Sequence, residues 1–272
     1  MSAGDLSALL IALREGVEMT LIVGIVLAYL AKVGAGRAAR WVWGGVLAAA
    51  ATSLVFLVIL NALGAEFQGA TEMIYEGIAM LLAAAFLTWM IFWMMERARF
   101  LRRELETGVD EALARGAAWG LFLLAFFTVV REGVETALLL FAAPGEGKLL
   151  GTIVGFAGAI AIGVLVYVFG RRIDLRAFFR VTGVLLVFFA AGLVTHGVHE
   201  FVEAGLPGGP TVFDLGEVLP DSSGVGAVLR TLFGYSADPS VLEVVVYFGY
   251  FVAVWALSRL RPARVAVAPR TA

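Results

Sequence analysis

The sequence contains no cysteine and only two histidines, His196 and His199. The absence of cysteine excludes disulfides, thiolate metal sites and iron–sulfur clusters. Because imidazole nitrogen is also scarce, any metal site in this chain has to rest mainly on carboxylate oxygens. The formal net charge of −2 is close to balanced for 272 residues, so charge gives no reason to expect a nucleic-acid partner, and we expect none.

Charged residues are also scarce, at 15%, whereas apolar residues make up 61% and the mean hydropathy is +0.94. These values lie outside the range of soluble globular domains. A helix needs roughly 20 residues to cross the bilayer core. Runs long enough to do so fall at 5–31, 41–63, 71–95, 116–142, 149–170, 178–204 and 241–260. The sequence therefore predicts an all-α integral membrane protein with seven transmembrane helices.

The distribution of basic residues between the connecting loops predicts the orientation of these helices. The loops on one side of the predicted membrane carry only two basic residues, Lys148 and Arg230. The loops and tail on the other side carry sixteen: Lys32, Arg37, Arg40, Arg97, Arg99, Arg102, Arg103, Arg115, Arg171, Arg172, Arg176, Arg180, Arg259, Arg261, Arg264 and Arg270. Because loops rich in Lys and Arg stay in the cytoplasm, we expect the N-terminus outside and the C-terminus inside.

Two of the predicted spans, the first and the fourth, contain an identical charged pentapeptide. The sequence Arg-Glu-Gly-Val-Glu occupies residues 14–18 and again 131–135. The second copy lies three predicted spans after the first, so the two halves of the chain face opposite ways across the membrane. Secondary transporters built from such inverted repeats bind their substrate near the midplane, between the halves.

The repeat and the loops predict a division of the chain into five parts. The segment 98–115 between the two halves is highly charged, which fits a juxtamembrane helix or, more simply, a solvated segment. The segment 207–240, between the sixth and seventh predicted spans, is acidic and rich in proline. The expected parts are a first three-helix repeat at 1–97, a cytoplasmic connector at 98–115, a second repeat at 116–206, an outer loop at 207–240, and a seventh helix with a cytoplasmic tail at 241–272.

Helical geometry places the charges of each pentapeptide on one side of its helix. At about 100° per residue, Arg14, Glu15 and Glu18 lie at about 0°, 100° and 40°. Gly16 lies on the other side, at about 200°, where a missing side chain allows another helix to approach closely. Arg14 and Glu18 are four residues apart and can pair, whereas Glu15 and Glu18 are three apart and can converge on one ion.

The second copy repeats this pattern, and the cost of burying both copies points to a function. A charged residue at a helix centre costs roughly 2.5–3.5 kcal/mol, so six cost on the order of 15–20 kcal/mol. Two arginines cannot neutralise four glutamates, and a surplus of buried carboxylate requires a cation or protonation. A structural ion-pair network is the weaker alternative. The predicted midplane ligands are Glu15, Glu18, Glu132 and Glu135, with Arg14 and Arg131 as supporting ion pairs.

A second group of metal-binding residue types lies at the predicted outer ends of the third and sixth spans. The corresponding inner ends, near Phe178, Thr182 and Arg97, carry no acidic residue. This asymmetry predicts capture of cations from outside, although residues at helix ends can also simply contact water. Glu243, early in the last span, is a further candidate. The predicted outer ligands are Glu72, Glu76, His196, His199, Glu200 and Glu203.

With its paired pentapeptides, the chain resembles the high-affinity iron permease family, which includes the fungal ferric iron permease and the bacterial permease of the elemental ferrous iron uptake system. The resemblance covers nearly the whole chain. It includes Glu76-Gly77, Thr88-Trp89-Met90, Glu203-Ala204-Gly205-Leu206, Phe213-Asp214-Leu215 and Phe233-Gly234-Tyr235. It implies that the four motif glutamates bind iron and that the chain is a multi-pass iron importer of the bacterial cytoplasmic (inner) membrane.

The resemblance also implies that import is coupled to oxidation of Fe²⁺ outside the membrane. A multicopper oxidase carries this out in fungi, and a periplasmic cupredoxin-like protein and a haem peroxidase are the implied bacterial partners. This chain has no oxidase or cofactor motif. We therefore expect a transporter rather than an enzyme, with no permanent cofactor and with Fe²⁺ or Fe³⁺ as its substrate.

Several alternatives use the same residues. Carboxylates also suit Mn²⁺, so a permease for another hard cation, or a proton-coupled cation transporter, is the main alternative. A retinal protein needs a lysine inside a span, but Lys32 and Lys148 lie at loop edges. The segment 199–203 lacks the second histidine of a zinc hydrolase, and two histidines on one helix cannot ligate a haem from facing helices.

Overall fold

The computed structural model describes residues 3–66, 68–97, 101–114, 118–145, 147–167, 175–221 and 224–260. Within these residues the regular elements are helices, and the only β-pairing is an isolated bridge between Thr211 and Ser240. The helices are α1 (Ala3–Lys32), α2 (Ala39–Glu66), α3 (Ala70–Arg97), α4 (Leu101–Ala114), α5 (Ala118–Ala142), α6 (Lys148–Tyr167), α7 (Leu175–Glu203), α8 (Gly224–Phe233) and α9 (Val241–Leu260), with a 3₁₀ turn η1 (Gly36–Ala38).

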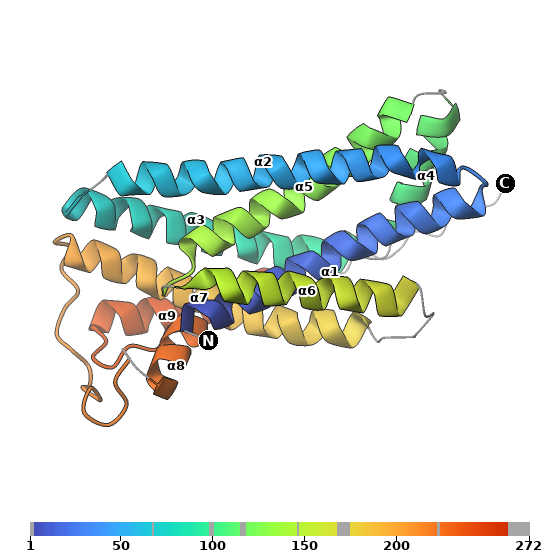
Figure 1. Cartoon of the computed structure of the whole chain (residues 1–272). Helices are drawn as coiled ribbons and strands as arrows, with labels where there is room; N and C mark the ends of the chain where they lie inside the picture. The colour runs from blue at the N-terminus through green and yellow to red at the C-terminus, as the bar shows by residue number, and fades with distance from the viewer. Residues whose placement is uncertain are drawn as a thin grey trace.

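Proline positions explain why the long helices run uninterrupted. Proline breaks a helix interior because it lacks an N–H and clashes with the preceding turn. All seven prolines lie outside the helices of the described residues or in the tail. Pro144 follows the end of α5, and Pro239 precedes the start of α9. Each predicted apolar run therefore forms one long helix, and these helices lie side by side along one direction (Figure 1).

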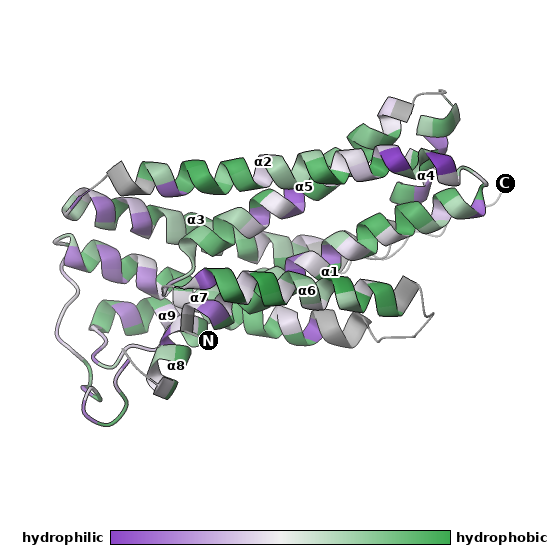
Figure 2. Cartoon of the chain, in the orientation of Figure 1, coloured by the Kyte–Doolittle hydropathy of each residue, from purple (hydrophilic) through white to green (hydrophobic). Residues whose placement is uncertain are grey.

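Five of the described helices, namely α2, α3, α6, α7 and α9, are long and apolar enough to cross a membrane. Helices α1 and α5 have comparable lengths of 30 and 25 residues but contain the charged pentapeptides. Exposed apolar side chains cover the outward surfaces of α2, α6 and α9, including Leu54, Ile153 and Val252. The ribbons of α2 and α6 are coloured hydrophobic over most of their length (Figure 2), as expected for helices in contact with lipid.

The centre of the molecule is built from α1, α3, α5 and α7. A buried apolar cluster joins them, with Ile11 from α1, Leu87 from α3, Leu139 from α5 and Leu193 from α7 among its members. Helix α6 packs along α1, and α2 packs along α5. The two helices that carry the pentapeptides are therefore covered on several sides, and the four glutamates of the pentapeptides are buried.

The glycine of each pentapeptide makes a close helix contact. A Cβ atom at Gly16 would lie 2.7 Å from the Cβ of Ala159 on α6, and one at Gly133 would lie 2.8 Å from the Cβ of Ser53 on α2. Real side chains do not approach that closely, so only glycine fits. The prediction that Gly16 faces a closely packed helix, away from the charged side, is confirmed.

Helix α4 lies within the predicted connector 98–115 but is not a solvated segment. Its side chains Leu105, Val109 and Ala112 are buried in an apolar cluster with residues of α1, α2 and α5. The hydroxyl of Tyr29 on α1 donates to Asp110 at 2.9 Å. The spacing of three and four residues gives α4 an apolar face, which docks on the bundle because charged residues occupy the other face.

The segment between α7 and α9 is ordered by short backbone contacts and by α8. The amide of Val212 donates to the Pro239 carbonyl at 2.9 Å, and the amide of Leu215 donates to the Ala237 carbonyl at 2.8 Å. Helix α8 packs on α7 and α1 at the same end of the molecule (Figure 1).

Several basic residues used to predict orientation lie outside the described residues, or have side chains that are not described. They are Arg97, Arg99, Arg102, Arg115, Arg171, Arg172, Arg176, Arg261, Arg264 and Arg270. The side chain of Phe178, used above to describe the inner end of the sixth span, is not described either.

Candidate metal centre

The two pentapeptides meet inside the bundle, where α1 contacts α5. Hydrophilic residues interrupt the otherwise mostly hydrophobic ribbons of α1 and α5 (Figure 2). The side chains of Glu15, Glu18, Glu132 and Glu135 are all buried, and Glu15 has no exposed surface. The prediction that the four glutamates lie in the interior is therefore confirmed at the level of burial.

Three of the four glutamates converge. One carboxylate oxygen each from Glu15, Glu132 and Glu135 lies within 4.8 Å of the other two. The Oε2 atoms of these three residues are buried without a hydrogen-bond partner among the described residues. A buried, unsatisfied carboxylate oxygen is costly, and three together repel one another. We call Glu15, Glu132 and Glu135 the glutamate cluster.

Glu18 lies beside the glutamate cluster but is not one of the three converging residues. Its Oε1 is 2.9 Å from Nη2 of Arg14, which is the pairing predicted from their spacing of four residues. The same arginine uses Nη1 to pair with Glu15 Oε1 and lies 3.5 Å from the sulfur of Met90 on α3. Arg14 therefore links both glutamates of its own pentapeptide.

Arg131 plays the same part in the second pentapeptide. Its Nε lies 3.1 Å from Oε1 of Glu132 and 3.5 Å from Oε1 of Glu135. The guanidinium also stacks on the ring of Trp93 from α3, 4.2 Å from the ring centroid. In each pentapeptide the arginine engages the Oε1 atoms, and the Oε2 atoms of the glutamate cluster remain for another ligand.

This division of oxygens determines what the glutamate cluster can bind. Two positive charges face four carboxylates, so the centre holds a surplus of negative charge if all the carboxylates are ionised. Three anionic oxygens from two helices suit a hard cation such as Fe³⁺ or Mn²⁺, because such ions prefer carboxylate ligands. The converging group contains no sulfur or nitrogen ligand.

The predicted outer ligands separate into two groups in the structure. His199 lies between two carboxylates, with Nε2 3.2 Å from Glu203 Oε1 and Nδ1 3.1 Å from Glu243 Oε1. These residues line a polar cavity of about 290 Å³, which we call the outer cavity. Its lining consists of Thr195, His196, His199, Glu203, Asp221, Arg230, Gly234, Tyr235, Ser236, Asp238 and Glu243.

The other predicted outer residues, Glu72, Glu76 and Glu200, do not line the outer cavity. Glu76 and Glu200 are partly buried and lie close enough for their charges to repel, whereas Glu72 is exposed. Sequence reasoning grouped these residues with the histidines because helical spacing places them at the same end of α3 and α7. It could not separate the two groups, because spacing does not give the distance between helices.

His196 lines the outer cavity, but both of its ring nitrogens are engaged. Its Nδ1 donates to the Gly192 carbonyl at 2.8 Å, and its Nε2 accepts from Nε of Arg230 at 3.4 Å. Sequence analysis did not select Arg230, Asp221, Tyr235 or Asp238 as site residues. The acidity of Asp221 and Asp238 was visible in the sequence, but no spacing rule relates the segment between α7 and α9 to residues of α7.

Comparison with known proteins identifies the relatives of this chain. Ferrous iron permease EfeU of Shigella sonnei (strain Ss046) is 39% identical over 271 residues, which cover 97% of this chain and 98% of that protein. Ferrous iron permease EfeU of Yersinia pestis is 37% identical over 261 residues, with 93% of each chain covered. No solved structure matches the chain. The pattern of the Iron permease FTR1 family matches residues 5–267, and the chain belongs to this family of membrane transporters.

Proposed function

We propose that this chain imports iron across the bacterial cytoplasmic membrane, with the glutamate cluster as its transport site. Family membership supports iron as the cargo. The observation that carries the choice of site is the convergence of three buried carboxylates, each with an Oε2 atom that has no hydrogen-bond partner among the described residues. Glu18, held by Arg14 beside the cluster, is a fourth ligand that becomes available when Arg14 moves.

The proposed topology has seven membrane spans, namely α1, α2, α3, α5, α6, α7 and α9, with the N-terminus outside. Five of these helices qualify by composition, and the lengths of α1 and α5 match them. The proposed parts keep the boundaries 1–97, 98–115, 116–206, 207–240 and 241–272. Lys148 and Arg230 then lie outside, and α4 lies at the cytoplasmic end, where the basic loops gather.

The packing of the long helices supports an inverted repeat. The α1–α6 contact corresponds to the α5–α2 contact, because exchanging the two halves turns one pair into the other. Gly16 of α1 contacts Ala159 of α6, just as Gly133 of α5 contacts Ser53 of α2. We call these two helix–helix interfaces seams, and each seam has one further close contact at an equivalent position.

In the second pair of contacts, Gly151 approaches the Asp5 carbonyl and Gly45 approaches the Phe122 carbonyl. In both seams the two contacts lie 11 residues apart on the pentapeptide helix and 8 residues apart on its partner. An equal register in both seams is expected if the two halves share one fold.

An iron-soaked crystal provides the direct test of the glutamate cluster. We expect an anomalous scattering peak at the iron edge between the carboxylates of Glu15, Glu132 and Glu135. The peak should be absent in a crystal soaked at the same concentration of Mg²⁺. An iron peak elsewhere in the bundle, with this cluster empty, would contradict the assignment.

The outer cavity is the proposed place of capture. Four acidic side chains, Glu203, Asp221, Asp238 and Glu243, face only one arginine there. A neutral imidazole has one N–H, so His199 can donate to only one of its two neighbouring carboxylates and leaves its other nitrogen for a cation. A cavity of about 290 Å³ admits an ion with part of its water shell, since one water occupies about 30 Å³.

Glu203→Gln is expected to raise the KM for iron uptake several-fold and to leave the maximal rate nearly unchanged. The reason is that the substitution weakens capture outside without altering the glutamate cluster. Uptake of radioactive iron over a range of concentrations separates the two quantities. Glu217→Gln is the matched control, because Glu217 is exposed in the same segment and does not line the outer cavity. Equal effects of both substitutions would exclude a specific role for the outer cavity.

Oxidation outside the membrane is proposed to come from partners, a cupredoxin-like protein and a haem peroxidase in bacteria. The described residues support this, because the glutamate cluster has no sulfur or imidazole ligand and carboxylates favour the ferric ion over the ferrous ion. A Mn²⁺ permease or a proton-coupled cation transporter remains the alternative. Competition by Mn²⁺ against iron uptake, with and without the partners, separates these functions.

A further inference from the structure

The two arginines of the pentapeptides differ in exposure although they occupy equivalent positions. The side chain of Arg14 is 4% exposed, whereas that of Arg131 is 39% exposed. The carboxylates that they pair with are buried in both cases. The glutamates are therefore accessible from the protein surface along the side chain of Arg131, whereas neighbouring residues cover them on the side of Arg14.

The residues one turn before each arginine show the same difference. Ile11 precedes Arg14 on α1 and is apolar and buried. Thr128 occupies the equivalent position before Arg131 on α5, is polar and is only half-buried. Each lies on the same face as the glutamates of its own helix, because residues three or four apart share a face. In the proposed topology α1 runs inward and α5 runs outward, so Ile11 lies on the outer side of the cluster and Thr128 on the cytoplasmic side.

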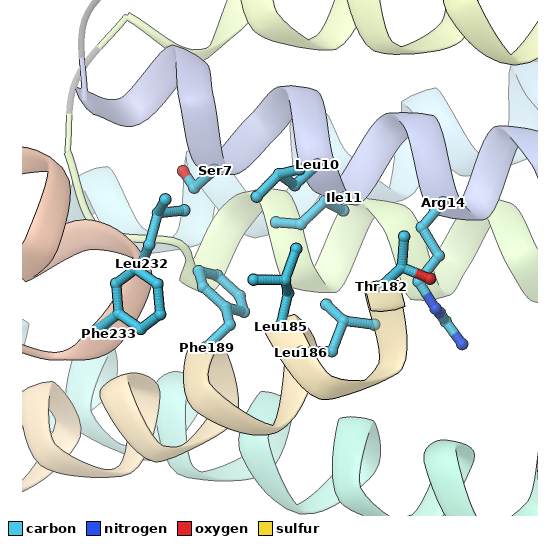
Figure 3. A pocket seen from close by; sticks show the side chains of 10 residues that line it. All are labelled: Ser7, Leu10, Ile11, Arg14, Thr182, Leu185, Leu186, Phe189, Leu232 and Phe233. Carbon is cyan, nitrogen blue, oxygen red and sulfur yellow. The ribbon is translucent and has the colours of Figure 1, made fainter. Parts of the chain in front are cut away.

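The space beside Ile11 is filled. A cavity of only about 20 Å³ lies between α1, α7 and α8, and Leu10, Ile11, Leu185, Leu186 and Phe189 form an apolar plug around it. Figure 3 shows these side chains pointing toward one another from α1 and α7, between Phe233 of α8 and Arg14. Ser7, Arg14 and Thr182 complete the lining with Leu232 and Phe233, but a cavity of about 20 Å³ is too small to conduct a hydrated ion, since one water occupies about 30 Å³ of liquid.

The exposed part of Arg131 requires water or another polar group. A guanidinium stays charged at all relevant pH values, and exposing a charge to hydrocarbon at a helix centre costs roughly 2.5–3.5 kcal/mol. Trp93 covers one face of Arg131 and lies near the end of α3, four residues before Arg97. Trp89, stacked obliquely on Trp93 at a centroid distance of 6.1 Å, is itself half exposed.

We infer that the edge between α3 and α5, marked by Trp93, Thr128 and Arg131, is the cytoplasmic access route of the glutamate cluster. The ion leaves by this route while the apolar plug closes the outer side. Helix packing agrees, because α5 packs extensively on α2 but only briefly on α3. The inference rests on the proposed function, and it assigns Arg131 and Trp93 the role of positioning residues at the exit.

The absence of cysteine allows a direct accessibility test, because any introduced thiol is the only one in the chain. Thr128→Cys and Trp93→Cys should react with a membrane-impermeant cationic methanethiosulfonate in inverted vesicles, at least about tenfold faster than in intact spheroplasts. Iron should slow the reaction. Thr128→Cys is nearly isosteric, so it reports access even if Trp93→Cys disturbs the stacking on Arg131.

Two control positions fix the interpretation. Leu82→Cys lies on α3 with an exposed side chain and should stay unreactive, since a thiol facing lipid does not ionise. Ile11→Cys, inside the plug, should stay unreactive from both sides. Reaction of Thr128→Cys only from outside, or no faster than Leu82→Cys, would overturn the proposed route. Labelling needs no transport, so this failure is distinct from loss of the iron assignment, which uptake by the glutamate variants decides.

Discussion

Glu135→Gln is expected to abolish most iron uptake, by at least about 100-fold, without destabilising the iron-free protein. Loss of a partner that merely orients a metal ligand typically costs 10–100-fold in affinity or activity, so loss of a ligand should cost at least as much. Glutamine keeps the shape of the side chain and retains an oxygen that can accept from Arg131, whose present distance to Glu135 is 3.5 Å. It removes one negative charge from a cluster that has a surplus.

The stability of the same variant distinguishes a transport site from a structural ion-pair network. If the glutamate cluster existed to hold the helices together, removing a charge would lower the thermal unfolding midpoint of the iron-free protein. If the surplus charge serves a passing cation, the midpoint should stay equal or rise, because a repulsive carboxylate is gone. Iron should then stabilise the unaltered protein more than Glu135→Gln, since a ligand stabilises only the state that binds it.

The measurement combines radioactive iron uptake in cells lacking other importers with thermal unfolding of purified protein. Glu111→Gln is the control, because Glu111 is exposed on α4 and is not one of the converging carboxylates. Normal uptake by Glu135→Gln, at normal expression, would remove Glu135 from the transport site. A lower midpoint with normal uptake would favour the structural network.

Sequence alone predicted the helices well, because their length and apolar composition are local properties. The face of the charged residues and the role of Gly16 also followed from helical spacing, and the Arg14–Glu18 pair has the predicted partners. The convergence of Glu15 with Glu132 and Glu135, leaving Glu18 aside, could not be predicted. It depends on the rotation of α1 against α5, which is set by contacts with α6 and α2.

Two further features lay beyond the sequence for different reasons. The docking of α4 was underestimated, because its charges are more conspicuous than the apolar face made by Leu105, Val109 and Ala112. The outer cavity draws Asp221 and Asp238 from an irregular segment, whose path is fixed by backbone contacts such as that between Val212 and Pro239. No spacing rule relates such residues to His199.

Arg14→Met is expected to be the most destabilising single change at the centre. It removes the partner of Glu15 Oε1 and Glu18 Oε1 and leaves both as buried, uncompensated charges. Breaking a buried ion pair by removing one partner typically costs about 3–5 kcal/mol in the free energy of unfolding. Arg131→Met should cost less, because the side chain of Arg131 is 39% exposed, so water can partly solvate the charges left behind.

A double-mutant cycle shows whether charge imbalance is the cause. Arg14→Met combined with Glu18→Gln removes one charge of each sign, so the pair should recover more than half of the stability lost by Arg14→Met alone. Denaturant unfolding of purified protein measures each corner of the cycle. If the loss came instead from the contact between the Arg14 guanidinium and the Met90 sulfur, the second substitution would restore nothing.

Iron provides an independent check on the same variant. A cation in the glutamate cluster replaces the positive charge that Arg14 supplied, so iron should stabilise Arg14→Met by more than it stabilises the unaltered chain. The opposite order, with iron stabilising the variant less, would mean that Arg14 helps to shape the site rather than compete with the ion. In the first case Arg14 is the counter-ion of the empty site, and Glu18 becomes available to the metal only when this arginine is displaced.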